Sequence, residues 1–341
     1  MNDNELYLVT GVAGNLGSSV AARLLEDGKR VRGLVLKGDP AAARVPREVE
    51  LCVGDVTDPA SLERFFAAPA DLQVYVIHCA AIVTVSDKYS QKVYDVNVTG
   101  TKNILAQCVA HQVKKLVHVS STSAIPELPM GTAITEVDAY DPAAVTGFYG
   151  KTKAEASQAV MDAVHDSGLD ASIVFPTGIC GPDDYAYGPV ASFIIDYLGG
   201  KMPAGVAGSF NAVDVRDLAD AIVACCKRGR SGQGYILGND LVTMGEMFHL
   251  LSSLTGAKEV TTILPAGVGK LMGRLCDLGE KLTHKPMRMT SFAVYNLIRN
   301  NEFDCAKAKR ELGFTTRPFA DTLADTIAWL EREHKIGAVA V

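Results

Sequence analysis

The stretch Leu6-Tyr7-Leu8-Val9-Thr10-Gly11-Val12-Ala13-Gly14-Asn15-Leu16-Gly17 determines the expected fold of this chain. Its first four residues form a short apolar run, which is typical of a buried parallel strand. Three glycines follow at a spacing of three, and apolar residues then repeat at helical spacing as far as Gly28. A strand, a glycine turn and a helix N-terminus in this order are suited to hold the pyrophosphate of a dinucleotide.

Each glycine of this turn has an expected role. Gly11 permits the tight turn, Gly14 lets the backbone approach the phosphates, and Gly17 lets the helix lie close to the strand. The spacing by itself is weak evidence in a chain with 31 glycines, and an ordinary glycine-rich turn is the alternative. The strand before the glycines and the helix after them favour the dinucleotide site.

Composition restricts the class of protein. The chain has 341 residues, 48% of them hydrophobic and 21% charged, which are values of a globular protein with one or two domains. The net charge of −6 and the lack of a basic patch argue against a nucleic-acid partner. The eight cysteines form no Cys-x-x-Cys pair, so we expect reduced thiols, and no cluster has the spacing of metal ligands. Met1–Glu5 lack the features of a signal peptide and no apolar run is long enough to span a membrane, so we expect a cytoplasmic protein.

The first half of the chain alternates strands and helices. Repeated units of this kind predict an α/β fold, a Rossmann-type doubly wound parallel sheet of about seven strands. The expected strands are Leu6–Val9, Arg30–Leu36, Glu50–Val53, Val74–Cys79, Leu116–Val119, Ala171–Phe175 and Gly234–Leu237, and the expected helices lie at about 60–68, 90–111, 149–167 and 214–227.

The pattern changes after Pro176. Glycines and prolines punctuate a loop-rich stretch that carries several aromatic residues, and the rest of the chain to Val341 is mostly helical. We therefore expect a dinucleotide-binding domain at 1–180, completed by about 211–238. A smaller, mostly helical substrate domain is expected at 181–210 and 239–341.

Several residues follow directly after strands and should meet at the carboxyl edge of the sheet. Asp55 could accept a hydrogen bond from an adenine amino group, and capping of the next helix is the equally favoured alternative. Ala80 and Ala81 would let backbone approach a dinucleotide, and His78 is expected to be a packed residue, not a base. The hydroxyls of Ser120, Ser121, Thr122 and Ser123 face the same crevice.

Tyr149 and Lys153 are four residues apart, so they share one face of a helix. An ammonium near a phenol lowers the phenol pKa, which suits a tyrosine to proton transfer near neutral pH. Tyr197 and Lys201 repeat the spacing, but Gly199 and Gly200 between them break a helix. Tyr149 is therefore the expected proton donor.

With these motifs in place, the chain resembles the extended short-chain dehydrogenase/reductase family, in its dihydroflavonol reductase-like and 3β-hydroxysteroid dehydrogenase-like branch. The matching motifs are Thr10-Gly11-x-x-Gly14-x-x-Gly17, Gly54-Asp55-Val56, His78-x-Ala80-Ala81, Asn97-Val98-Thr99-Gly100-Thr101, Ser120-Ser121, Tyr149-x-x-x-Lys153, Pro176-Thr177 with Gly181-Pro182, Val213-Asp214-Val215-Arg216-Asp217 and Arg317-Pro318-Phe319. They cover most of the chain, and together they are specific for the family but not for a substrate.

The resemblance implies a role for each matching residue. Tyr149 would be the general acid/base, Ser121 would polarise the same substrate oxygen, and Lys153 would hold the nicotinamide ribose and tune Tyr149. Residues implied in cofactor binding are Gly11, Gly14, Asn15, Leu16 and Gly17 at the pyrophosphate, Asp55 and Val56 at the adenine, and Ala80, Ala81, Asn97, Pro176 and Gly178 at the ribose and nicotinamide. The implied chemistry is hydride transfer to or from a carbonyl or carbinol carbon.

The departures from the family narrow the substrate. Nucleotide-sugar enzymes of the family usually continue the serine strand into a Val-Tyr-Gly turn, where this chain has Ser123-Ala124-Ile125-Pro126, and 181–210 contains only one basic residue, Lys201. A neutral ketone or aldehyde is therefore favoured. The alternatives are a nucleotide-sugar epimerase or dehydratase and, from another class, a non-catalytic dinucleotide-binding regulator, against which the intact Ser121, Tyr149 and Lys153 argue.

The end of the second expected strand bears on the choice of dinucleotide. NAD-selective relatives usually have an acidic residue at the position that falls on Val35 here. Lys37 follows, where an ammonium could meet a 2′-phosphate, so NADP(H) is expected and NAD(H) remains possible. Asp39 could act as the acid if the loop is shifted, and Lys37 could be an ordinary solvated lysine.

Two expectations concern partners. Helices 90–111 and 149–167 are those that relatives often pair into a homodimer. The stretch 267–282, with Leu271, Met272 and Leu275, could be a membrane-surface helix, but Lys270, Arg274 and Lys281 form no dense basic face. We therefore expect a substrate-lid or core helix there, and no membrane partner.

Overall fold

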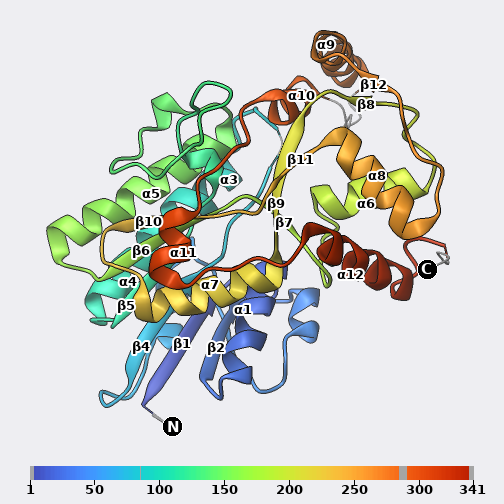
Figure 1. The fold of residues 1–341 in the computed structure, drawn as a ribbon. Coiled ribbons are helices and arrows are strands. Elements are labelled where there is room, and N and C mark those ends of the chain that lie inside the picture. Colours follow the sequence, from blue (N-terminus) through green and yellow to red (C-terminus); the bar gives the residue numbers. More distant parts are fainter. Residues whose placement is uncertain (1–3, 85, 284–289, 338–341) are drawn as a thin grey trace.

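A parallel seven-stranded sheet forms the central layer of the protein (Figure 1). The computed structural model describes residues 4–84, 86–283 and 290–337. The strand order is β10-β6-β5-β4-β1-β2-β3. The strands are β1 (Glu5–Thr10), β2 (Arg30–Val35), β3 (Glu50–Val53), β4 (Gln73–His78), β5 (Lys115–Val119), β6 (Ala171–Pro176) and β10 (Gln233–Leu237). The expected doubly wound sheet of seven strands is confirmed.

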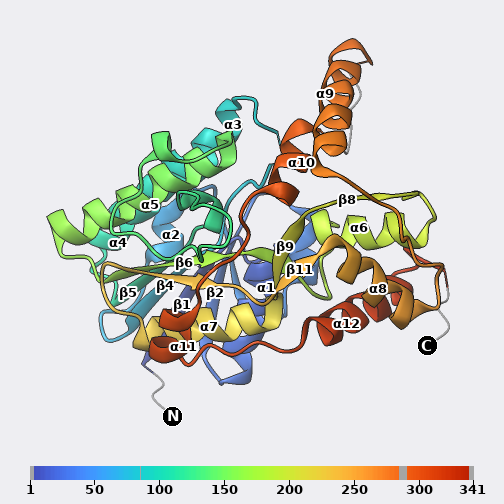
Figure 2. The ribbon, with the colours of Figure 1, turned by 45° about the horizontal axis from the view of Figure 1, so that its top comes forward.

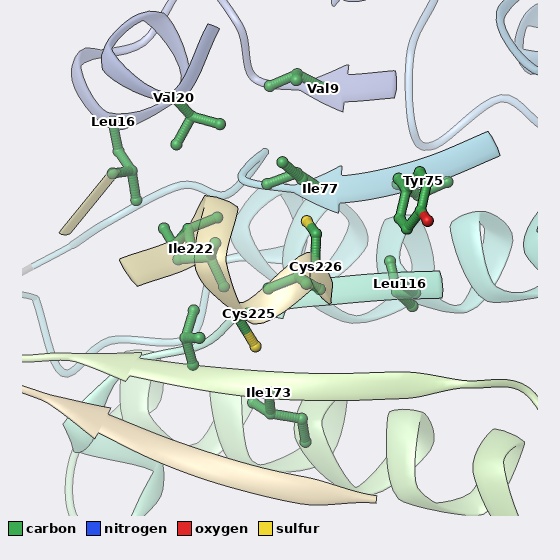
Figure 3. Close-up of a cluster of buried hydrophobic side chains, with 14 of the residues drawn as sticks. Val9, Leu16, Val20, Tyr75, Ile77, Leu116, Ile173, Ile222, Cys225 and Cys226 are labelled. Carbon is green, nitrogen blue, oxygen red and sulfur yellow. The ribbon is translucent and has the colours of Figure 1, made fainter. Parts of the chain in front are cut away.

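Helices cover both faces of this sheet, as the buried apolar strands require. α1 (Asn15–Glu26) and α7 (Val215–Arg228) pack together on one face, and α4 (Gly100–Ala110) and α5 (Phe148–Ser167) cover the other (Figure 2). In Figure 3, side chains of α1 and α7 meet those of the strands: Leu16, Val20, Ile222, Cys225 and Cys226 lie on the face of the sheet that carries Val9 and Ile77. None of the eight cysteines, all of which lie in the described residues, forms a disulfide.

Two expected helices are interrupted. The stretch 90–111 divides into α3 (Gln91–Tyr94), a π-helical turn η3 (Asp95–Thr99) and α4. The wider turn directs Asn97 away from the helix ladder and onto neighbouring segments, a common use of π turns at functional sites. The stretch 60–68 begins as a 3₁₀ turn, η2 (Pro59–Leu62), which Asp58 caps, and continues as the short α2 (Glu63–Phe66).

A second buried cluster lies outside the sheet. It joins α6 (Pro189–Leu198), α8 (Met244–Thr255) and α12 (Phe319–Arg332) through side chains that include Tyr197, Phe248 and Trp329. The stretch expected to be loop-rich therefore contains a helix, α6, with Pro189 at its first position, where the missing N–H costs nothing. Gly199 caps its end.

Short strands and helices complete the second half. The pattern of the sequence did not indicate the three-stranded sheet β11-β9-β7 or the two-stranded sheet β12-β8. The elements not yet named are η1 (Pro40–Arg44), η4 (Thr122–Ala124) and η5 (Pro142–Ala144) in the first half, and β7 (Gly178–Cys180), β8 (Gly205–Val206), β9 (Ser209–Asp214), β11 (Leu241–Thr243), β12 (Ile263–Leu264), α9 (Ala266–Thr283), α10 (Ser291–Ile298) and α11 (Ala306–Leu312) in the second.

One segment of the expected substrate domain packs with the sheet instead. Cys305, Ala308, Leu312 and Phe314, in and around α11, belong to the buried cluster of the seven-stranded sheet. The proposed division into two domains stays a prediction, and α11 would be assigned to the first domain on its packing.

An ion-pair cluster connects the two halves. Arg317 contacts Asp217 at 2.7 Å and Asp214 at 3.5 Å, and Arg216 bridges Asp214 at 2.8 Å and Asp325 at 2.7 Å. Asp214 is fully buried, so its charge depends on these partners. The two motifs that extend the family resemblance into the second half therefore join the start of α7 to α12.

Candidate active site

The carboxyl ends of β1, β4 and β5 lie side by side in the sheet order. The glycine turn follows β1, Ala80 and Ala81 follow β4, and Ser121 follows β5. The direction in which the chain adds strands to the sheet reverses between β1 and β4, because β2 and β3 lie on one side of β1 and β4 lies on its other side. Such switch points are where doubly wound sheets bind ligands.

The glycine turn leaves no room for side chains at two of its positions. Gly11 has φ of 67°, and a Cβ there would lie 2.9 Å from the backbone nitrogen of Ala80. A Cβ on Gly17 would lie 2.1 Å from the carbonyl oxygen of Gly11. A Cβ on Gly14 would meet that oxygen at 3.2 Å, a milder contact. Gly11 and Gly17 are therefore required by the backbone itself.

The start of α1 fits an anion. Gly14 is the N-cap and has no side chain, so the first N–H groups of the helix, beginning at Asn15, Leu16 and Gly17, remain for a ligand. Among the described residues, the side-chain oxygen Oδ1 of Asn15 is buried without a hydrogen-bond partner. These features fit the pyrophosphate of a dinucleotide that the sequence predicts.

Asn97 holds the loop after β4 in place. Its Oδ1 accepts from the backbone N–H of Ile82 at 2.8 Å, and its Nδ2 donates to the Ile82 carbonyl and to Thr152 Oγ1, each at 3.1 Å. Ala80 donates its backbone N–H to Thr10 Oγ1 at 3.1 Å. The side chain of Asn97 therefore positions the loop beside the expected nicotinamide site, and its polar atoms are already engaged.

Tyr149 and Ser121 form the centre of the site. The Ser121 hydroxyl lies close enough to the Tyr149 phenol to influence its pKa. Gly150 makes this approach possible, because a Cβ at that position would lie 2.6 Å from the carbonyl oxygen of Ser123. The sequence did not point to Gly150, although a glycine in the first turn of a helix is a usable sign of close packing.

Lys153 lies behind this pair. Its ammonium is buried and donates to the carbonyl oxygen of Val119 at 2.7 Å. Burial lowers the pKa of Lys153 to about 8. The lysine is therefore held against the end of β5, one helical turn from Tyr149.

The pKa of Tyr149 differs from the expectation. Burial raises it to about 12, and the nearby Ser121 hydroxyl opposes this rise. The expected lowering by Lys153 was wrong for this structure, because the ammonium is directed to the Val119 carbonyl. A phenol with this pKa is protonated throughout the neutral range, which suits a general acid.

His78 is a packed residue, as expected. It is buried, with Nδ1 at 2.7 Å from Thr10 Oγ1 and Nε2 at 3.1 Å from Thr101 Oγ1. Burial lowers the pKa of His78 to about 3, so the ring stays neutral near neutral pH.

Asp55 and Val56 stabilise the turn after β3. Asp55 Oδ1 accepts from the N–H and the hydroxyl of Thr57, both at 2.8 Å. The alternative role of helix cap belongs instead to Asp58. Val56 is buried against Gly100. A role at the adenine remains a prediction for both residues.

The turn after β2 displays Lys37. Its side chain is exposed, and Asp39 is used as the cap of η1, where its Oδ1 accepts from Ala41 N at 2.9 Å. Val35 ends β2 and is buried. Farther along, the Arg44 guanidinium lies 4.3 Å from the centre of the Tyr185 ring. Asp39 is thus occupied in the loop, and the lysine is directed to solvent.

Pro176 and Gly178 flank the passage from the large sheet to the small one. Pro176 ends β6 and Gly178 begins β7. The hydroxyl of Thr177 between them is buried and, within the described part of the chain, has no hydrogen-bond partner. Thr177 is therefore an additional polar group for the cofactor or substrate to satisfy.

Aromatic side chains gather at the start of α5, close in sequence to Tyr149. Gly147, with φ of 85°, lies directly under the Phe292 ring of α10, and a Cβ there would meet the ring at 2.5 Å. The rings of Tyr89 and Phe148 lie 5.1 Å apart, and Asp87 Oδ1 accepts from Phe148 N at 3.1 Å. No local pattern indicated Phe292, because it comes from an element far along the chain.

Comparison with known proteins is consistent with this geometry. Residues 7–238 match the NAD dependent epimerase/dehydratase family, and the chain belongs to that family. The expected membership of the extended short-chain dehydrogenases/reductases is confirmed.

Individual relatives extend over nearly the full length. Sterol demethylase protein B of Methylococcus capsulatus is 29% identical, with 96% of this chain and 99% of the relative covered. A putative dihydroflavonol 4-reductase of Synechocystis sp. is 27% identical over 96% and 95% of the two chains. The crystal structure of gox2253 superposes with a TM-score of 0.85 at 29% identity and covers 98% of this chain and 100% of its own. The family and these names indicate an NAD-dependent oxidoreductase or epimerase.

Proposed function

We propose that this chain is an NAD(P)-dependent oxidoreductase that reduces a ketone or aldehyde, or oxidises the corresponding alcohol. The observation that supports this most strongly is the placement of Ser121 beside Tyr149, with Lys153 buried behind them, at the edge of the sheet that carries the glycine turn. A non-catalytic dinucleotide-binding protein has no need of this arrangement.

The chain's own residues would act in distinct ways. Tyr149 donates its proton to the substrate oxygen as the alcohol forms, and accepts it in the reverse direction. Ser121 hydrogen-bonds to the same oxygen and holds it next to the phenol. Lys153 holds the nicotinamide ribose and places a positive charge behind Tyr149. The bound nicotinamide dinucleotide supplies or takes up the hydride.

The surroundings of Tyr149 favour a neutral, largely apolar substrate over a sugar nucleotide. Phe292, Phe148 and Tyr89 contribute aromatic surface. Lys201, the basic residue of 181–210, pairs with Asp196 at 3.4 Å. Arg228 and Arg230, farther along, reach Leu312 O and Glu311 near the end of α11. A diphosphate group on the substrate would need basic side chains that are not already paired within the protein.

The decisive experiment follows nicotinamide absorbance over a panel of aldehydes, ketones of steroid and flavonoid type, and sugar nucleotides. Turnover of at least one neutral carbonyl compound supports the proposal. Conversion of sugar nucleotides alone would favour the epimerase or dehydratase of the same family and refute the proposed substrate class.

The rate of reduction is expected to depend on pH through Lys153. Because its folded-state pKa is lowered to about 8, the ammonium is present below this pH and lost above it. We therefore expect kcat/KM to be level on the acid side and to fall above about pH 8. The pKa values of His78, about 3, and Cys79, about 12, lie far from this region.

The matched variant for this profile is Lys153→Arg, whose guanidinium keeps its charge. The fall should move to higher pH in this variant. A wild-type profile that remains level about two pH units beyond the pKa would contradict the role of Lys153.

The preferred dinucleotide is proposed to be NADP(H), with Lys37 at the 2′-phosphate. The wild type is expected to bind NADPH more tightly than NADH, and Lys37→Ala to reduce this ratio about tenfold through loss of a charge-assisted contact. Fluorescence titration with both dinucleotides measures the ratio.

Lys114→Ala is the control. Lys114 is also exposed, but it directly precedes β5 and therefore lies at the amino ends of the strands, away from the expected dinucleotide site. Equal or tighter binding of NADH by the wild type would refute the preference. If Lys37→Ala leaves the ratio of NADPH affinity to NADH affinity unchanged, a residue other than Lys37 binds the 2′-phosphate.

A further inference from the structure

Helix α9 is fixed to the protein by a face of small residues. A Cβ on Gly269 would lie 2.4 Å from Val206 of β8, and a Cβ on Gly273 would lie 2.9 Å from the backbone of Ser291 in α10. Both glycines are buried. The helix therefore cannot rotate to turn another face inward without separating from β8 and α10.

The opposite face of α9 is apolar and exposed. Six side chains are between 36% and 74% exposed, and their positions place them on one stripe of the helix. They are Val268, Leu271, Met272, Leu275, Leu278 and Leu282. The expectation of a core helix was therefore wrong for these side chains. In both views α9 projects beyond the rest of the molecule (Figures 1 and 2).

Among the side chains of α9 that the structure describes, the two acids are paired and two basic residues are exposed. Asp277 Oδ1 accepts from the Ser291 N–H at 3.1 Å, and Glu280 pairs with Lys88 at 3.1 Å, so both acids are engaged on the side of the protein body. Lys270 and Arg274 are exposed. At 100° per residue Arg274 lies about 40° from Leu278, at the border of the apolar stripe, and Lys270 lies about 80° from it, closer to Asp277. The exposed face therefore combines apolar side chains with positive charge.

A second copy of the chain matches this face less well. The positions 268, 271, 275, 278 and 282 have the spacing of a coiled-coil seam, but they extend over only about 21 Å of helix, too short for the roughly 1,200 Å² that a stable interface buries. In an antiparallel pair of α9 helices, Arg274 of one copy would also face the basic side of the other copy, and these like charges repel.

We propose that α9 docks the protein on the surface of an anionic phospholipid bilayer. The helix lies in the plane of the interface, with the stripe among the acyl chains and Lys270 and Arg274 at the headgroups. Within the described residues no helix has both the length and the apolar character needed to cross a bilayer, so the contact is peripheral.

Docking would also orient the candidate active site. α9 packs on α10, and Phe292 of α10 covers Gly147, two residues before Tyr149. The substrate side of the site is thus joined to the docking helix through one element. Docking itself does not depend on the proposed reaction, and the following test needs no substrate.

The experiment is co-sedimentation of the full chain with vesicles of phosphatidylcholine alone, and with vesicles in which about a third of the lipid is phosphatidylglycerol. We expect weak, reversible, salt-sensitive binding to the anionic vesicles. Leu271→Ser with Leu275→Ser should reduce this binding at least about tenfold. Lys270→Gln with Arg274→Gln should reduce it roughly tenfold.

The control is Leu51→Ser, which changes an exposed leucine on edge strand β3 and should bind as the wild type does. Thermal unfolding of each variant checks the fold, which exposed substitutions should leave intact. Failure of the wild type to bind anionic vesicles overturns the proposal, as does unchanged binding of the double-leucine variant. A wild-type dimer that the leucine substitutions dissociate, without vesicle binding, would assign the stripe to a second copy instead.

Discussion

Tyr149→Phe is expected to lower turnover about 10²- to 10⁴-fold, because it removes the proton donor and keeps the ring. The interaction of the phenol hydroxyl with Ser121 is lost, but the aromatic packing at the start of α5 is kept. Dinucleotide binding and thermal stability should therefore stay close to those of the wild type. Steady-state kinetics with the best substrate of the panel, together with dinucleotide titration, measures both quantities.

Tyr197→Phe is the matched control. The Tyr197 hydroxyl donates to the carbonyl oxygens of Phe248 at 3.4 Å and Lys258 at 3.2 Å, within the second buried cluster. Its removal should cost about 1 kcal/mol of folding free energy and leave turnover nearly unchanged. Similar rates for the two variants would show that Tyr149 is not the proton donor.

Gly17→Ala is expected to weaken dinucleotide binding about 100-fold or more and to lower the melting temperature. Alanine would ordinarily favour a helix, but here its Cβ would lie 2.1 Å from the carbonyl oxygen of Gly11. The start of α1 must then move away from the glycine turn, which displaces the N–H groups aimed at the pyrophosphate. Equilibrium titration with NADPH or NADH and thermal unfolding test this.

Gly245→Ala provides the comparison, since Gly245 also lies in the first turn of a helix, α8, but a Cβ there meets nothing within 4 Å. This variant should bind dinucleotide normally and be at least as stable as the wild type. Normal binding by Gly17→Ala would remove the glycine turn from the proposed cofactor site.

The sheet was predictable because its signals are local. Each strand is a short apolar run between turn residues, and the chain order of strands and helices is that of a doubly wound fold. The small sheets were not predictable, because strands such as β8 have only two residues and depend on partners distant in the sequence.

The site was predictable where a motif specifies backbone geometry. Gly11 and Gly17 occupy positions that exclude a Cβ, and Ser121 meets Tyr149. The lowering of the Tyr149 pKa by Lys153 was predicted incorrectly, because spacing on a helix fixes a shared face but not the partner that a long side chain selects. Pairing into a homodimer stays a prediction, which sedimentation analysis of the full chain tests.

Long-range contacts account for the rest. Phe292 reaches Gly147 across more than a hundred residues, and the outward direction of the α9 leucines follows from the packing of Gly269 against β8. A helical pattern shows that a helix has an apolar side, but it does not show whether that side meets the core.

The packing of α11 has a consequence for how the protein is made. Cys305, Ala308, Leu312 and Phe314 fill part of the core of the sheet whose first strand begins at Glu5. During synthesis the strands leave the ribosome long before these residues do, so one part of the core of the nascent sheet stays unfilled until residues 305–314 have been made. The core of the sheet is completed only by residues of and around α11. A chain terminated near residue 240 would therefore expose apolar surface and require a chaperone, although it contains all seven strands.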